Sequence, residues 1–149
     1  MGFTGTISAR TDAKGRVFFP SEFRKMLSEE EPALIVRRDL YQPCLVVYPR
    51  AAWNEELAWF RQNLNRRIPH EAMLFRQFMA EVEQLTLDAA GRFLIPKHLL
   101  QAARINGAVV FLGVDDRVEI WSPEVKNSLF LPDADLAKVM EKAGSATNQ

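Results

Sequence analysis

The 149-residue sequence is poor in metal-binding and redox side chains, with one cysteine and two histidines. A single thiol, Cys44, excludes an internal disulfide framework and any multi-cysteine zinc site. His70 and His98 have no second ligand at metal-binding spacing, so we expect no metal site. The scarcity of cysteine is typical of a cytosolic protein.

Long apolar runs and the common catalytic motifs are also missing. No apolar stretch approaches the roughly 18 residues that a membrane span requires. The first ten residues do not show the layout of a secretory signal. The motifs G-x-G-x-x-G, G-x-x-x-x-G-K-[ST] and G-x-S-x-G do not occur, so nothing indicates a nucleotide-dependent enzyme or a serine hydrolase. We therefore expect a cytoplasmic protein that is not an enzyme and has neither cofactor nor membrane partner.

The sequence has no net charge, because 19 Lys and Arg balance 19 Asp and Glu. Nucleic-acid-binding proteins usually carry a basic excess on at least one face. The charge is unevenly distributed, however. Residues 1–26 hold five basic and two acidic side chains, and residues 87–104 hold three and one, whereas 27–49 and 105–149 are acidic. If the two basic segments meet in space, a neutral protein presents a local basic surface.

A duplicated motif coincides with these two basic segments. Residues 11–20 (TDAKGRVFFP) and 87–96 (LDAAGRFLIP) share Asp, Ala, Gly, Arg and Pro at identical positions. Three apolar residues stand between the Arg and the Pro in both copies. The offset is too long for a solenoid repeat and indicates a duplicated half-domain.

Each copy predicts the same order of elements: strand, tight turn, short strand, proline-initiated helix, and two further strands. Asp at the turn entry can cap backbone N–H groups, and Gly supplies the left-handed conformation that the turn needs. The expected strands are 3–11, 16–19, 33–37 and 45–48, then 85–87, 92–95, 108–112 and 118–121. The expected helices of the two copies are 21–27 and 97–104.

The segment between the copies has helical periodicity. Trp53, Leu57, Phe60 and Leu64 form one apolar stripe, and Ile68-Pro69 interrupts it. A second expected stripe consists of Leu74, Phe78, Val82 and Leu85. We therefore predict four segments: a first half at 1–49, a helical hairpin at 50–84, a second half at 85–123, and C-terminal helices with a frayed tail (144–149) at 124–149.

The two D-x-x-x-R motifs in matching context resemble the MraZ family. The opening Phe3-x-Gly5, the run Pro43–Pro49 and the strand Glu119–Trp121 add to this resemblance, which covers about residues 3–130. It implies a mixed β fold with helices, in which two SpoVT-AbrB-like swapped-hairpin halves of one chain interleave into a single β-barrel with a helical hairpin insert. Such interleaving would bury the triplets 17–19 and 93–95 against each other and bring both D-A-x-G-R loops to one face.

The resemblance also implies a function. MraZ proteins are bacterial, cytoplasmic and nucleoid-associated transcription regulators. They bind double-stranded DNA at short direct repeats upstream of the division and cell-wall gene cluster, and they assemble into homo-oligomeric rings of eight or more subunits. We carry these properties forward as expectations for this sequence.

Arg16 and Arg92 are the candidate DNA-contacting residues. Each Arg can pair bidentately with guanine or clamp a phosphate, or it can simply form an ion pair with the Asp of its own turn. In the first interpretation Asp12, Gly15, Asp88 and Gly91 orient the arginines. Lys14, Arg10 and Arg24 are further candidate DNA contacts, and each is equally well explained as a solvated charge. Ala90 replaces the Lys14 of the first copy, so the two halves should contact DNA unequally.

A second hypothesis needs no DNA. The protein could be an oligomeric interaction scaffold in which the D-x-x-x-R hairpins are purely structural. Part of the predicted hairpin would then form a subunit interface. Its large side chains are Trp53, Trp59, Phe60, Phe75, Phe78 and Met79. A steep loss of nucleic-acid binding with salt distinguishes the two hypotheses.

Overall fold

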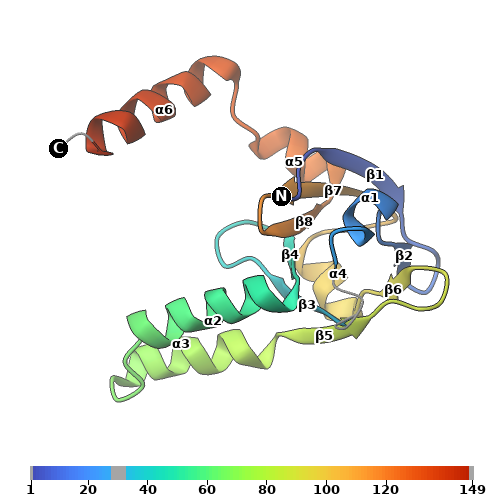
Figure 1. Cartoon of the computed structure of the whole chain (residues 1–149), viewed down its shortest axis with the longest axis horizontal. Helices are drawn as coiled ribbons and strands as arrows, with labels where there is room; N and C mark the ends of the chain where they lie inside the picture. Colours follow the sequence, from blue (N-terminus) through green and yellow to red (C-terminus); the bar gives the residue numbers. More distant parts are fainter. Residues whose placement is uncertain (1, 28–32, 148–149) are drawn as a thin grey trace.

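The computed structural model describes residues 2–27 and 33–147 and shows a β-sheet body from which helices project (Figure 1). The strands are β1 (Thr6–Arg10), β2 (Arg16–Phe18), β3 (Ala33–Arg38), β4 (Leu45–Tyr48), β5 (Glu83–Thr86), β6 (Arg92–Leu94), β7 (Ala108–Val114) and β8 (Arg117–Trp121). The helices are α1 (Ser21–Arg24), α2 (Arg50–Asn63), α3 (Pro69–Ala80), α4 (Lys97–Ala102), α5 (Pro123–Leu129) and α6 (Asp133–Thr147). The expected mixture of strands and helices is confirmed.

The strands form two antiparallel sheets. The larger sheet has the order β1-β7-β8-β4-β3-β5, and the smaller one pairs β2 with β6. The expected closed barrel is wrong for the described residues, because β1 and β5 are open edges of the larger sheet. Each D-A-x-G-R turn is closed by its own backbone bonds, between Asp12 and Arg16 or Asp88 and Arg92. Beyond the turn, the two flanking strands take partners elsewhere instead of continuing as a hairpin ladder.

Most strand pairing in the described residues joins one half of the sequence to the other. The pairs β1–β7, β2–β6, β3–β5 and β4–β8 each combine a strand from before residue 49 with one from after residue 82. Only β3–β4 and β7–β8 pair strands within one half. The order of the larger sheet is unchanged when the copies are exchanged, so the duplication in the sequence appears as a pseudo-two-fold axis in the fold.

The short strands β2 and β6 alternate strictly between core and surface. Val17, Phe19, Phe93 and Ile95 are at most 2% exposed and belong to the main core cluster. The middle residues of the two triplets point outward, with Phe18 56% and Leu94 51% exposed. The expectation that both triplets are wholly buried is therefore wrong, because successive side chains of a strand lie on opposite faces.

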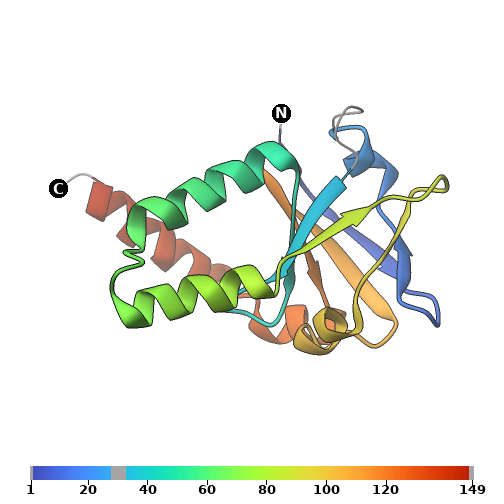
Figure 2. The same cartoon turned by 90° about the horizontal axis from the view of Figure 1, so that it is seen from below.

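Helices α2 and α3 form the predicted hairpin, which extends from one end of the body (Figure 2). Trp53 and Phe60 of α2 pack with Phe78 of α3 against the sheet. The second predicted stripe is too long, because α3 ends at Ala80 and Leu85 lies in strand β5. Within the described parts of the chain, none of the helices has the length and hydropathy needed to cross a membrane.

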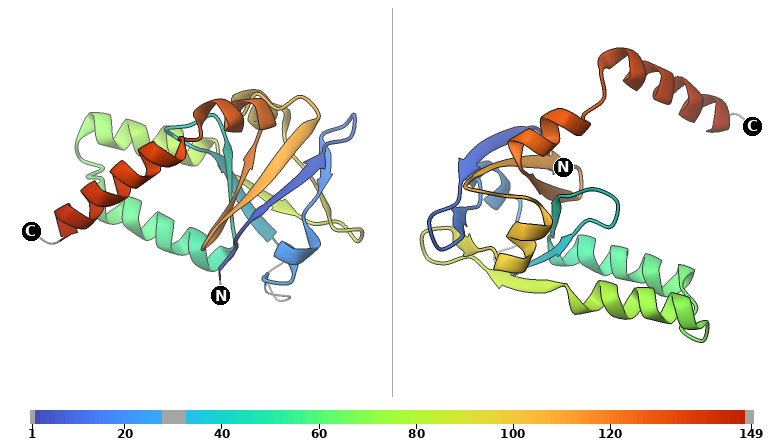
Figure 3. Two further views of the ribbon diagram at one scale, coloured as in Figure 1. Left: turned by 90° about the horizontal axis from the view of Figure 1, so that it is seen from above. Right: turned by 180° about the vertical axis from the view of Figure 1, so that it is seen from behind.

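The C-terminal helix α6 stands apart from the sheets (Figure 3). It begins at Asp133 and continues to Thr147. The predicted frayed tail is therefore wrong for residues 144–147, and residues 148–149 lie outside the described residues. Helices α1 and α4 also end earlier than predicted, at Arg24 and Ala102.

Candidate nucleic-acid interface

The first D-A-x-G-R turn is held by one carboxylate. Oδ1 of Asp12 accepts the backbone N–H groups of Lys14 and Arg16, both at 2.9 Å. Its other oxygen, Oδ2, accepts the Nε–H of Arg16 at 2.7 Å. One side chain therefore closes the turn and sets the direction of the arginine.

The second turn repeats this arrangement. Oδ1 of Asp88 accepts the backbone N–H groups of Ala90 and Arg92 at 2.9 Å, and Oδ2 accepts the Nε–H of Arg92 at 3.0 Å. The identical residues of the duplicated motif are thus those that build the turn. Both turns lie at the same end of the molecule, opposite the α2–α3 hairpin (Figures 1 and 2).

These bonds stabilise the charged form of both aspartates. The hydrogen bond donated by the backbone N–H of Arg16 lowers the pKa of Asp12 most, and the hydrogen bond from the Arg16 side chain lowers it further. The Arg92 backbone and side chain lower the pKa of Asp88 in the same way. Both turns therefore favour the ionised form of their carboxylates.

Strands β2 and β6 place the two arginines on one outer face. In the register of this ribbon, Arg16 lies opposite Leu94 and Phe18 lies opposite Arg92. Because side chains two residues apart share a face of a strand, Arg16, Phe18, Arg92 and Leu94 form a two-by-two array. The Cζ of Arg92 lies 5.8 Å from the centre of the Phe18 ring. The sequence predicted the arginines of this face but not its two apolar members, whose exposure follows only from the β alternation.

The glycines of the turns are required by their surroundings as well as by their backbone. Gly15 and Gly91 have φ of +92° and +88°. A Cβ on Gly91 would overlap the guanidinium of Arg24, and a Cβ on Gly15 would lie 3.3 Å from Leu100 Cδ1. Arg24 of the first half therefore contacts the second turn, at Gly91. Leu100, the corresponding residue of the second half, contacts the first turn, at Gly15.

The remaining predicted contacts lie near one or the other turn. Lys14 is exposed at its tip and lines a concavity of about 550 Å³ with Lys97 and Asn106. Arg10 is exposed at the end of β1, beside Gly107. Arg24 is only partly exposed, and its Nε is buried without a hydrogen-bond partner among the described residues. Lys14 is thus part of the Arg16 turn, Arg24 contacts the Arg92 turn, and Arg10 lies beside Gly107, which lines the same concavity as Lys14.

Comparison with known proteins identifies the family. A sequence model described as "MraZ protein, putative antitoxin-like" matches residues 2–76 and 78–126. The chain belongs to the MraZ family. A protein of Phocaeicola vulgatus named "Transcriptional regulator MraZ" is 47% identical over 149 residues, covering 99% of this chain and 97% of the relative.

More distant MraZ relatives extend the match. One from Bacteroides fragilis is 46% identical, covering 98% of this chain and 96% of its own length. One from Carboxydothermus hydrogenoformans is 41% identical over 128 residues, 85% of each chain. Both carry the name "Transcriptional regulator MraZ". The MraZ family model includes both D-A-x-G-R turns and ends before α6 begins.

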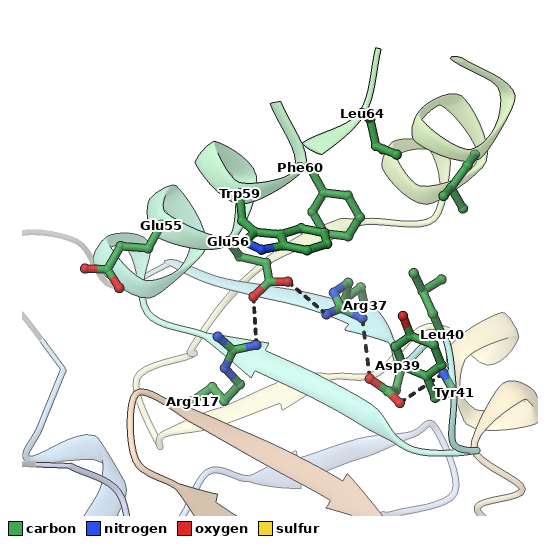
Figure 4. A pocket seen from close by; sticks show the side chains of 11 residues that line it. Arg37, Asp39, Leu40, Tyr41, Glu55, Glu56, Trp59, Phe60, Leu64 and Arg117 are labelled. Carbon is green, nitrogen blue, oxygen red and sulfur yellow. Dashed lines mark hydrogen bonds and ion pairs between the residues drawn. The ribbon is translucent and has the colours of Figure 1, made fainter. Parts of the chain in front are cut away.

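This MraZ chain has a second concavity, of about 530 Å³, between α2 and the β3–β4 connection (Figure 4). Its floor is a buried network. Arg37 donates to the Tyr48 hydroxyl at 2.6 Å, and Glu56 lies 2.9 Å from Arg117 and 3.8 Å from Arg37. Burial raises the pKa of Tyr48 to about 12, although both arginines act to lower it.

This second concavity does not suit a polyanion. The carboxylates of Asp39, Glu55 and Glu56 outnumber the two arginines that line it, and Glu56 already occupies both guanidinium groups. Its network instead fastens α2 to β3, β4 and β8. In the described residues, no group of three or more His, Cys, Asp or Glu side chains is placed to hold a metal ion.

Proposed function

We propose that this protein is a sequence-specific DNA-binding transcription regulator. Its target would be the promoter of the division and cell-wall gene cluster, where it would bind short direct repeats. The observation that carries the proposal is the outer face of the β2–β6 ribbon, where Arg16 and Arg92 from the two halves occupy diagonal positions on the same face. The name shared by its relatives supports the same conclusion.

The geometry of the arginines suits base recognition. The aspartates accept Nε–H, and in the described part of the chain no hydrogen bond engages the terminal nitrogens of Arg16 or Arg92. Two parallel N–H groups per arginine therefore remain for the O6 and N7 acceptors of a guanine. The major groove admits a two-stranded β-ribbon, and β2–β6 is such a ribbon at the end of the molecule.

The supporting charges would hold the protein on the DNA backbone. Lys14 and Lys97 share one concavity beside the first turn, and cations at such positions bind phosphate without sequence preference. Arg10 and Arg24 would add to this contact. The aspartates and glycines of the turns would orient the arginines without touching DNA.

The pairing of strands between the halves supports a duplicated swapped-hairpin fold of the SpoVT-AbrB type. A ring of eight or more subunits would bring several such ribbons onto closely spaced repeats. Linked sites bind at a high effective concentration, so modest affinity per subunit suffices. Such a regulator would act in the cytoplasm, at the nucleoid.

The proposal is tested with Arg16→Ala and Arg92→Ala on DNA from upstream of the gene. Each lost bidentate contact removes about 1–3 kcal/mol of discrimination. We therefore expect specific binding to fall by about 5- to 150-fold in a gel-shift titration for each variant, with an unchanged mass by light scattering. Arg61→Ala, on the exposed surface of α2 at the opposite end, is the matched control and should bind as wild type. Undiminished binding by the Arg16→Ala variant contradicts the proposal.

The scaffold hypothesis makes the opposite prediction about salt. A protein that contacts several phosphates loses affinity steeply between 50 and 200 mM salt, whereas a scaffold with structural D-x-x-x-R turns does not bind DNA even at low salt. Measuring the gel-shift midpoint over this range separates the two.

A further inference from the structure

The outer face of the β2–β6 ribbon contains two apolar side chains that the arginine contacts do not explain. Phe18 is 56% and Leu94 is 51% exposed, although each lies between two residues that are almost completely buried. Both occupy the equivalent position of the duplicated motif, the middle of the apolar triplet. The fold therefore presents a large apolar group twice, once per half, at the place where DNA is proposed to bind.

The register places each apolar side chain beside an arginine of the other half. Phe18 lies opposite Arg92, and Leu94 lies opposite Arg16. Side chains directly opposite each other on an antiparallel pair are about 4.5–5.5 Å apart. Adjacent base pairs are about 3.4 Å apart along one strand, so an arginine and its apolar neighbour, both flexible side chains, can reach neighbouring base pairs.

The two arginines on this face favour duplex DNA over a second copy of the chain as the binding partner. A second copy of the chain that docked by the same face would bring two further arginines against Arg16 and Arg92, which is unfavourable. Duplex DNA supplies phosphates for the charges and also has one apolar group in the major groove, the C5-methyl of thymine. Apolar side chains such as Phe contact that methyl group in other complexes.

We infer that Phe18 and Leu94 recognise thymine methyl groups in the major groove, each on a base pair next to the one that its neighbouring arginine contacts. This inference rests on the proposed function and extends it to the second class of base contact. The arginines would select guanine by hydrogen bonds, and the apolar pair would select thymine by excluding water from the methyl group.

The test uses a DNA fragment protected by the wild-type protein, in which the thymines of the footprint are replaced by deoxyuridine. This replacement removes only the methyl group and keeps the hydrogen-bonding pattern of the base. Burying one methyl-sized group is worth a factor of about four in affinity. We expect the wild-type protein to bind the uridine fragment about fourfold more weakly for each methyl that it contacts, in a fluorescence anisotropy titration.

The matched variants are Phe18→Ala, Leu94→Ala and the double variant. Each single variant should lose part of the discrimination between thymine and uridine, and the double variant should lose it completely while still binding through its arginines. Leu131→Ala removes a similarly exposed apolar side chain ahead of α6 and should discriminate as wild type does.

Three outcomes overturn the inference. The first is equal binding of the two fragments by the wild-type protein. The second is full discrimination retained in the double variant. The third is a change in assembly mass in the Phe18→Ala variant, which would show that this face binds a second copy. A wild-type protein that binds no fragment at all overturns the proposed function itself, so the two failures are distinguishable.

Discussion

At the residue scale, Arg24 and Gly91 depend on each other. Arg24 follows the first apolar triplet, yet its guanidinium occupies the space that any side chain at position 91 would need. Gly91 also has a φ of +88°, a conformation that costs other residues about 1–2 kcal/mol. Two separate penalties therefore oppose a side chain at this position.

Gly91→Ala should lower the free energy of unfolding by more than Gly5→Ala does. Gly5 has a similar φ of +83°, but a Cβ there meets nothing within 4 Å, so its variant isolates the backbone penalty of about 1–2 kcal/mol. The excess in the Gly91 variant should disappear when Arg24→Ala removes the guanidinium. Urea denaturation of the wild type, the three single variants and the Arg24→Ala/Gly91→Ala double variant measures these differences. Equal losses on Gly91→Ala with Arg24 present and with Arg24→Ala would contradict the contact.

The roles of Gly15 and Gly91 in the turn could be predicted from the sequence, whereas the neighbour of Gly91 could not. A D-A-x-G-R segment carries its own turn chemistry, because Asp caps the backbone N–H groups that follow it and Gly takes positive φ. The contact between Arg24 and Gly91 joins the two copies and arises only when the halves pair. Local chemistry was therefore recoverable from the sequence, and contacts across the pseudo-two-fold axis were not.

At the element scale, the two turns have the same geometry and different charge. The backbone N–H of Ala90 donates to the Oδ1 of Asp88 as that of Lys14 donates to the Oδ1 of Asp12, and both side chains are exposed. The asymmetry between the halves therefore lies in the side chain and not in the shape of the turn. The second turn has room for a lysine without rearrangement.

Ala90→Lys should strengthen DNA binding by adding one phosphate contact. The slope of log K against log salt should become steeper by about 0.9, the value for one neutralised phosphate of a duplex. Ser145→Lys on the exposed surface of α6 adds the same charge far from the turns and should leave the slope as it is. Equal slopes for these two variants would show that the second turn does not approach DNA.

The strands show which features the hydrophobic pattern of the sequence can predict and which it cannot. Both apolar triplets predicted short strands, and β2 and β6 are found there. Three consecutive apolar residues do not reveal the alternation, because an exposed apolar side chain looks the same in sequence as a buried one. Similarly, Leu85 continued a helical stripe by its spacing, yet it lies in β5, where pairing with β3 overrides the local pattern.

At the scale of the whole molecule, the zero net charge has to be considered together with the duplicated motif, because both copies of the motif lie in basic segments of the sequence. Arg16 and Arg92 of the two copies lie with Lys14 at the end that carries the turns, where Asp12 and Asp88 pair with the two arginines. A net charge of zero therefore reduces general attraction to DNA and leaves a local basic face. Binding should then depend on the placement of the repeats more than on bulk electrostatics.

The pairing between halves also makes the fold a single cooperative unit. Phe19 is 1% exposed, and its ring contacts Phe23 of its own half and Phe93 and Phe111 of the other. If one half unfolded, the other half would lose the strand pairs and core contacts that join the two. Unfolding should therefore be one transition, although the sequence contains two copies of the motif.

Phe19→Ala should lower the free energy of unfolding by about 3–5 kcal/mol, the usual cost of removing a buried aromatic side chain. The loss should appear at the same urea concentration by far-ultraviolet circular dichroism and by tryptophan fluorescence, since both halves lose their common core together. Phe18→Ala, the exposed neighbour on the same strand, is the matched control and should change stability by less than about 1 kcal/mol. Two separate transitions in the Phe19→Ala variant would show that the halves fold independently, and the pairing of strands across the pseudo-two-fold axis would then contribute little to stability.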